Sequence, residues 1–323
     1  MVTPEISIGV PVYNGASAGL SSTLDSIISQ SFENFELIIS DNASTDETQE
    51  ICQDYARRDR RVRYHVNAAN IGAGANFNRV FELSRGRFFK WAAADVQCLP
   101  GMLQRCYDIA ADSRRGFSLV YPRCQMVDLA GEPLQIEPKS IMLPHAPPHR
   151  RMMRVIDSVA WVNQLYGLMP RDVLRRTRLL DSFASSDWVL LAELAILGEI
   201  HEIPEVLLKR TYDPASGSAA QKGAKNWAVW LDTSLSGRRF LLSPEQRVFC
   251  EYMRSACRLG PGTGGKAACL SAAAYGWGKR RALAKINRVS SICADIWTSK
   301  QVCVAKIDHI STEGDDASPG LTL

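Results

Sequence analysis

The 323-residue chain lacks several patterns that would assign it directly to a class of protein. Its nine cysteines form no CxxC pair and no closely spaced framework, which argues against a disulfide scaffold and indicates reduced, cytosolic thiols. No run reaches the roughly 18 apolar residues needed to span a bilayer, and the first residues lack the basic start and apolar core of a signal peptide. We therefore expect a globular, cytoplasmic protein.

Nucleotide-binding glycine loops and a histidine metal site are missing as well. The first apolar run ends in PVYNG rather than in the G-x-G-x-x-G of dinucleotide-binding folds, and the chain has no P-loop. A nucleotidyltransferase would need a basic, glycine-rich first loop, but residues 11–20 hold no Lys or Arg. The five histidines have no ligand spacing, so we expect them in loops or on the surface.

Positive charge is concentrated in one part of the chain. The formal net charge is +4, but residues 236–300 hold 12 Lys or Arg against 3 Asp or Glu. Within this stretch, residues 276–289 have the pattern of an amphipathic helix and are a candidate for peripheral contact with an anionic membrane. The alternative is a solvated helix that packs back on the rest of the chain. No nucleic-acid recognition motif accompanies the charge, so no nucleic-acid partner is expected.

Short apolar runs alternate with helical patterns over the first 130 residues. The helical patterns lie around residues 20–28, 44–55 and 76–83. Strands are predicted at residues 6–12, 35–40, 62–66, 87–93 and 119–121, followed by a hairpin at 126–134. This alternation predicts an α/β fold with a mostly parallel, doubly wound sheet and helices on both faces.

The later part of the chain is less regular. The prolines of EPKSIMLPHAPPHRR, residues 137–151, predict a loop, and the segment from about 135 to 151 is a candidate lid over an acceptor. A helix is predicted from Trp188 to Leu197, and a pair of strands is predicted around Pro204. The expected domains are a catalytic domain at residues 1–235, a helical basic region at 236–312 and a disordered tail at 313–323.

Polar residues follow three of the predicted strands. Tyr13 follows the first strand, Asp41 the second and Asp95 the fourth. In open α/β sheets, ligands bind at the carboxyl ends of the strands. At such an edge, Tyr13 can stack on a nucleobase and Asp41 can accept an N–H from it. Asp95 would lie beside the phosphates, where a carboxylate helps only if a divalent cation lies between the two.

Three stretches together resemble the nucleotide-sugar domain of family 2 glycosyltransferases, which have the GT-A fold. They are ISIGVPVYNG, SIISQSFENFELIISDNASTDET and NIGAGANFNRVFELSRGRFFKWAAAD. The similarity continues through YGLMPRDVLRRT and SSDWVLLAELAILGEIHEIPEVLLKR, so that it covers about residues 5 to 215. Each motif is weak alone, but their combination is specific.

The resemblance implies roles for individual residues. Asp95 falls on the carboxylate of the family's D-x-D motif, and Asp187 falls on its catalytic base. The donor-binding residues that it implies are Pro11, Tyr13, Asn14, Asp41, Asn70, Asn76 and Asp95. Each acid also has a plain structural interpretation: Asp41 and Asp95 suit turns, and Asp187 suits the first turn of a helix.

The chain departs from the family pattern at the metal site. Family members carry several acids in the segment where this chain has only Asp95, and their metal-site histidine falls on Asp213. The resemblance therefore implies a divalent cation, Mn²⁺ or Mg²⁺, on Asp95 and Asp213, held by a reduced motif.

The expected function is that of an inverting glycosyltransferase. It moves a sugar from a nucleotide-sugar donor, most simply a UDP-sugar, to a hydroxyl of a glycan or lipid-linked acceptor in polysaccharide or glycolipid synthesis. Asp187 would deprotonate that hydroxyl. The scarcity of acids around Asp95 leaves an alternative, a catalytically inactive protein of the same fold that binds nucleotides or glycans.

Overall fold

The computed structural model describes residues 3–112, 115–134, 139–215, 224–235 and 242–282. The chain divides into two compact units, Met1–Gly276 and Trp277–Leu323. Of the second unit, only residues 277–282 are described, and they are helical. The predicted domain boundary after residue 235 stays a prediction, as do the tail at 313–323 and the membrane contact at 276–289, most of which lie outside the described residues.

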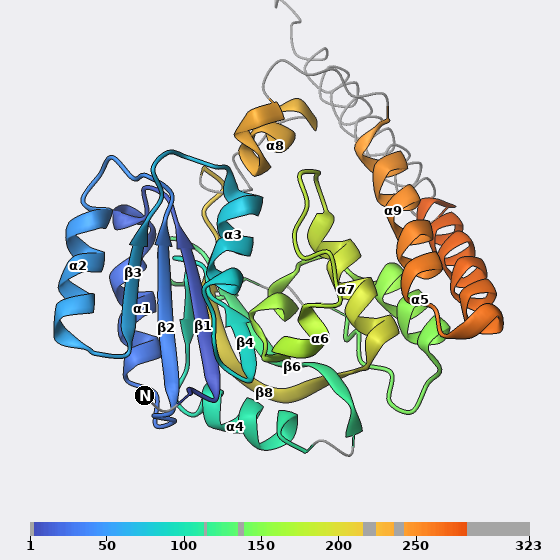
Figure 1. The fold of residues 1–323 in the computed structure, drawn as a ribbon, viewed down its shortest axis with the longest axis horizontal. Helices are drawn as coiled ribbons and strands as arrows, with labels where there is room; N and C mark the ends of the chain where they lie inside the picture. Colours follow the sequence, from blue (N-terminus) through green and yellow to red (C-terminus); the bar gives the residue numbers. More distant parts are fainter. Residues whose placement is uncertain (1–2, 113–114, 135–138, 216–223, 236–241, 283–323) are drawn as a thin grey trace, which may run out of the picture. The chain divides into compact units, whose positions relative to one another are not determined.

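A five-stranded sheet with the order β3-β2-β1-β4-β7 forms the centre of the first unit. Its strands are β1 (Ile6–Val12), β2 (Phe35–Asp41), β3 (Val62–Val66), β4 (Phe88–Trp91) and β7 (Met169–Pro170). The first four are parallel, lying side by side in Figure 1, and β7 is antiparallel to β4. Every residue of β1 and β2 is buried, as expected for central strands covered on both faces. The predicted mostly parallel sheet is confirmed.

Helices cover both faces of this sheet (Figure 1). They are α1 (Leu20–Ile28), α2 (Thr48–Arg58) and α3 (Ala73–Glu82). The next helix along the chain is α4 (Met102–Ala110), which packs mainly on the second sheet described below. Because the connection from β3 returns across the sheet to β4, right-handed crossovers place α3 on the face opposite α1 and α2. Helix α3 starts three residues before its prediction, directly after Gly72, whose φ of 87° suits glycine.

A second sheet holds three strands in the order β5-β8-β6. They are β5 (Val96–Cys98), β6 (Phe117–Val127) and β8 (Glu199–Thr211). The pair of strands predicted around Pro204 is wrong, because β8 runs through this position as one strand. Its register against β6 passes from Ile203 to Val206 at an irregularity, so Pro204 occupies a place where no ladder hydrogen bond is required.

The region predicted as a proline-rich loop ends in a helix. Residues 139–147 are irregular, but α5 spans Pro148–Ser158, so the loop prediction is wrong for its last residues. Pro147 is the N-cap and Pro148 the first helical residue, a position that needs no backbone N–H donor. Proline therefore begins a helix here instead of preventing one.

The remaining helices complete the unit. They are α6 (Arg171–Leu174), α7 (Ser186–Leu197), α8 (Ala224–Leu231) and α9 (Pro244–Leu259), with short 3-10 turns at Ala16–Ala18, Asn163–Tyr166 and Thr233–Leu235. Residues 262–276 are helical as well. Helix α7 ends at Gly198 as predicted and begins two residues before Trp188. No helix among the described residues is both long and apolar enough to cross a membrane.

Buried charges join α7 to α9. Glu193 and Glu251 are 1% and 0% exposed, and the guanidinium of Arg178 pairs with both of them. Arg178 Nη2 also donates to Ser255 Oγ at 2.9 Å. Arg258 also pairs with Glu193, and Arg247 and Arg254 also pair with Glu251, so the two buried carboxylates share several positive partners.

Replacing Arg178 with methionine is expected to destabilise the protein by about 2 kcal/mol, because its charge-assisted hydrogen bonds to both glutamates are lost while Arg258 still pairs with Glu193 and Arg247 and Arg254 still pair with Glu251. Urea unfolding followed by circular dichroism measures the change. The matched control is Arg57→Met, which removes a solvent-exposed pair with Asp54 at 3.5 Å and should cost under about 1 kcal/mol. Equal effects of the two substitutions would contradict the prediction.

Candidate active site

The predicted polar strand ends meet at one edge of the main sheet. Val12, the last residue of β1, pairs in register with Asp41 at the end of β2. Strand β4 lies on the other side of β1. In the segment that follows β4, the carbonyl oxygen of Ala94 accepts the Thr23 hydroxyl at 2.9 Å. Tyr13 is 49% exposed at this edge. The structure thus brings Tyr13, Asp41 and the segment of Asp95 together on three adjacent strands.

Asp41 lies beneath this surface. Its side chain is fully buried and accepts the Ser44 backbone N–H at 2.8 Å and the Tyr64 hydroxyl at 2.8 Å, each on a different oxygen. Burial and this hydrogen bond to Asp41 raise the pKa of Tyr64. Each carboxylate oxygen can accept a further hydrogen bond, so Asp41 keeps acceptor capacity.

The predicted asparagines hold the loops of this edge in place. Asn14 has a φ of 48°, which asparagine tolerates, and its Oδ1 accepts the Thr45 N–H at 2.9 Å. Asn70 Oδ1 accepts the Gly72 N–H at 2.9 Å at the start of α3. Asn76 is buried and its Nδ2 donates to the Ser40 carbonyl at 2.9 Å, while Pro11 is buried within β1. In this state these side chains bind protein groups, and their contact with a donor stays a prediction.

Asp95 forms an ion pair that its sequence did not indicate. Its Oδ2 accepts the Nε–H of Arg210 at 2.9 Å, and the two side chains are 29% and 20% exposed. Arg210 belongs to β8 and pairs with Val96 of β5 in the antiparallel ladder, while Thr211 donates its N–H to the Asp95 carbonyl at 3.0 Å. The second sheet therefore fixes the guanidinium beside the carboxylate.

Two further residues hold Arg210. Its Nη1 donates to Asn163 Oδ1 at 3.0 Å, and its guanidinium carbon lies 5.6 Å from the centre of the Tyr166 ring. A cation over an aromatic face gains about 0.5–2 kcal/mol. Both partners come from the 3-10 turn that precedes β7. Carboxylate, amide and ring together set one orientation of the guanidinium.

Asp187 lies in the first turn of α7, as predicted, and belongs to the same group of charges. Its Oδ1 accepts the Trp188 N–H at 2.9 Å. Burial raises the pKa of Asp187 to about 6, and the nearby positive charge of Arg210 opposes part of that rise. A carboxylate with this pKa is ionised at neutral pH and basic enough to accept a proton in catalysis. Arg210 thus links Asp95 electrostatically to Asp187.

The predicted cation ligands do not form a cage. Asp213 Oδ1 accepts the Ala215 N–H at 2.8 Å within an exposed turn, and Oδ2 of Asp95 is bonded to Arg210. Throughout the described residues, no three His, Cys, Asp or Glu side chains gather as a metal-binding group. At nucleotide sites Mg²⁺ is bound by one or two carboxylates together with substrate phosphates, and the Asp95 carboxylate here already neutralises Arg210, so the described donors do not fit a dedicated site for Mn²⁺ or Mg²⁺.

Arg210, Tyr166, Asn163 and Tyr64 were missed by sequence reasoning. They come from other elements than the acids they accompany, and no spacing in the sequence links them to Asp95 or Asp41. The available signal was the basic pair Lys209-Arg210, close to the predicted metal ligand Asp213.

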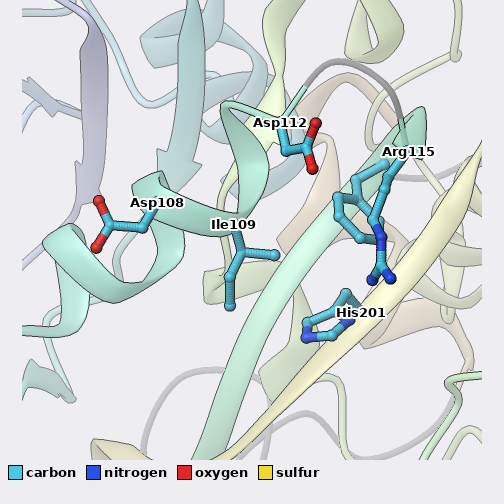
Figure 2. A pocket seen from close by; sticks show the side chains of 6 residues that line it. Asp108, Ile109, Asp112, Arg115 and His201 are labelled. Atoms are coloured by element: carbon cyan, nitrogen blue, oxygen red, sulfur yellow. The ribbon is translucent and has the colours of Figure 1, made fainter.

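A separate hollow lies at the other end of the second sheet (Figure 2). Its lining residues are Asp108, Ile109, Asp112, Arg115, Phe117 and His201. Phe117 is the first residue of β6 and His201 the third of β8, whereas Arg210 is next to the last of β8. Because β6 and β8 are parallel, this hollow is remote from the carboxyl-end site.

Two solved structures that bind nucleotide sugars share this fold. The residues 1–349 structure of TarS from S. aureus, in complex with UDP-GlcNAc, superposes with a TM-score of 0.54 at 14% identity, covering 86% of this chain and 91% of that one. The mannosyltransferase PcManGT from Pyrobaculum calidifontis, in complex with GDP-Man and Mn²⁺, gives a TM-score of 0.50 at 15% identity, covering 94% and 85%. The fold is of the GT-A type.

Sequence comparison gives the family. Residues 7–167 match Glycosyl transferase family 2, and the chain belongs to this family. An uncharacterized glycosyltransferase of Methanocaldococcus jannaschii is 26% identical over 136 residues, 42% of this chain and 47% of that protein. TuaG of Bacillus subtilis, named for teichuronic acid biosynthesis, is 30% identical over 115 residues, 36% and 45% of the two chains. The matches span less than half the length of these relatives.

Proposed function

We propose that this protein is an inverting glycosyltransferase that moves a sugar from a nucleoside diphosphate to an acceptor hydroxyl. The observation that carries the proposal is the convergence of Asp95, Arg210 and Asp187 at the carboxyl edge of a GT-A sheet. The match to glycosyltransferase family 2 supports catalysis over the alternative of an inactive binding protein.

The donor lies along the strand ends in this proposal. Its nucleobase stacks on the exposed ring of Tyr13. Asp41 is fully buried in this state, and it shapes this edge from beneath by accepting from Ser44 and Tyr64. The diphosphate extends toward Asp95, in the segment after β4, and toward Arg210, next to the last residue of β8. UDP-linked sugars are the first candidates, because TarS was solved with UDP-GlcNAc, and GDP-linked sugars are the second, after PcManGT.

Transfer is a single displacement. The acceptor oxygen forms a bond to the anomeric carbon while the bond from that carbon to the diphosphate breaks, and its electron pair leaves with the diphosphate. Asp187 accepts the proton of the acceptor hydroxyl. The configuration of the anomeric carbon is inverted. No step is assigned to a divalent cation, because the described donors do not fit one.

For the acceptor and the cellular location, we propose only a general class. A glycan or lipid-linked acceptor in polysaccharide synthesis is supported by relatives such as TuaG. A cytoplasmic location and a peripheral membrane contact through residues 276–289 stay predictions from the sequence.

Ligand-induced thermal stabilisation tests the proposal. UDP or GDP at saturating concentration is expected to raise the melting temperature of the protein, because a ligand at 100 times its Kd stabilises by about 2.7 kcal/mol. The corresponding nucleotide sugars should then be hydrolysed slowly or transferred. AMP is the matched control and should give no shift. Absence of a shift with UDP, GDP and TDP, with and without Mn²⁺, would contradict the proposed function.

A further inference from the structure

The diphosphate of a departing nucleotide needs a positive partner. As the bond to the sugar breaks, negative charge develops on the leaving oxygen, and fixed positive groups in a partly buried site stabilise it. The described residues offer no cluster of carboxylates and histidines to hold a metal ion for this purpose. They do offer Arg210, whose guanidinium carries a permanent charge.

Resting on the proposed function, we infer that Arg210 occupies the place of the divalent cation: its guanidinium, held by Asp95, Asn163 and Tyr166, binds the donor diphosphate. Asp95 is then a positioning residue for Arg210 rather than a metal ligand. This accounts for the loss of the other acids around Asp95, since one carboxylate suffices to anchor one guanidinium.

The geometry leaves donors for such a ligand. Arg210 uses Nε on Asp95 and one hydrogen of Nη1 on Asn163, and Nη2 takes part in none of the hydrogen bonds formed within the described residues. A guanidinium has five N–H donors in a planar fork, which matches two phosphate oxygens. Its side chain is 20% exposed, so it is accessible while its charge is only partly screened by water.

The order of mutant effects separates this inference from a metal site. In a metal site Asp95 is a ligand, so Asp95→Asn would abolish diphosphate binding and Arg210→Met would matter less. If Arg210 binds the diphosphate, Arg210→Met has the larger effect, and Asp95→Asn retains the positive charge. A purely structural ion pair would affect nucleoside and diphosphate binding equally.

Calorimetric titration with UDP and with uridine, in EDTA and in Mn²⁺, makes the test. Wild-type protein should bind UDP in EDTA with a Kd within about threefold of that in Mn²⁺. Arg210→Met should weaken UDP binding about 10- to 100-fold, the range of a charge-assisted hydrogen bond, and leave uridine within about twofold. Arg210→Lys and Asp95→Asn should lose less than Arg210→Met.

Arg123→Met is the matched control, because Arg123 lies on β6 in an exposed pair with Glu202 at 3.1 Å, and it should bind UDP like wild type. The inference is overturned if wild-type UDP binding requires Mn²⁺, or if Arg210→Met weakens UDP and uridine equally. If Arg210→Met does not fold, UDP binding by Arg210→Lys and Asp95→Asn is compared with wild type instead, and abolished binding in Asp95→Asn would overturn the inference. Failure of wild-type protein to bind UDP or GDP in either buffer would instead refute the proposed function. If only GDP binds, the same titrations are made with GDP and guanosine.

Discussion

Asp187→Asn is expected to lower the rate of sugar transfer about 10³-fold, within the range by which a general base accelerates a reaction. Asparagine has nearly the same shape and cannot accept the acceptor proton. The Kd for UDP should stay within about twofold, because Asp187 acts on the acceptor and not on the nucleotide. Measuring kcat with donor and acceptor, together with UDP binding, separates the two effects.

The same variant should remain folded. The pKa of Asp187 in the folded protein, about 6, lies above its ordinary value of 3.8. Its contribution to stability is therefore present at low pH and lost as pH rises through about 6, so at pH 7 the partly buried carboxylate costs stability. Asp187→Asn removes this cost, and its melting temperature at pH 7 should equal or exceed that of wild type. Full activity in this variant would remove Asp187 from the mechanism.

The main sheet could be predicted because the local sequence pattern of each strand and helix is enough to identify it. The runs that form β1 and β2 are almost wholly apolar, which only a doubly covered strand tolerates, and Leu20, Leu24 and Ile27 are buried at the helical spacing that predicted α1. Strand ends in a parallel sheet share one edge, so Tyr13, Asp41 and Asp95 could be assigned to one site before the structure was known.

The second sheet could not be predicted in the same way. Pro204 indicated a break, but it lies at an irregularity between β8 and β6, which depends on a pairing between residues far apart in sequence. Pro148 indicated a loop, although it begins α5. Local propensity fails at these positions because tertiary pairing decides whether a proline interrupts an element or fits it.

The partner of Asp95 was hidden for the same reason. Asp95 and Arg210 are 115 residues apart and become neighbours only through the antiparallel ladder of β5 and β8. The sequence showed that the metal motif was reduced and could not show what had replaced the missing acids. A family resemblance transfers roles only to residues with a known motif role, and Arg210, although it ends the matched stretch EVLLKR, was assigned none.

Transfer activity should rise with pH through about 6, because Asp187 must be ionised to accept a proton and burial sets its pKa at about 6. At pH 5 only about one enzyme in ten carries the ionised form, so kcat/KM should be about tenfold below its plateau. A profile of kcat/KM from pH 4.5 to 8, over which folding is checked by circular dichroism, measures the limb.

Arg210 ties this profile to the inferred diphosphate site. Its positive charge favours the ionised form of Asp187, so Arg210→Met should move the acidic limb to higher pH in addition to weakening donor binding. Arg123→Met should leave the limb in place, because Arg123 pairs with Glu202 and is not among the groups that shift the pKa of Asp187. A limb that stays near pH 6 in Arg210→Met would show that the two side chains do not interact, whereas a flat profile in wild type would show that the ionisation of Asp187 does not control the reaction.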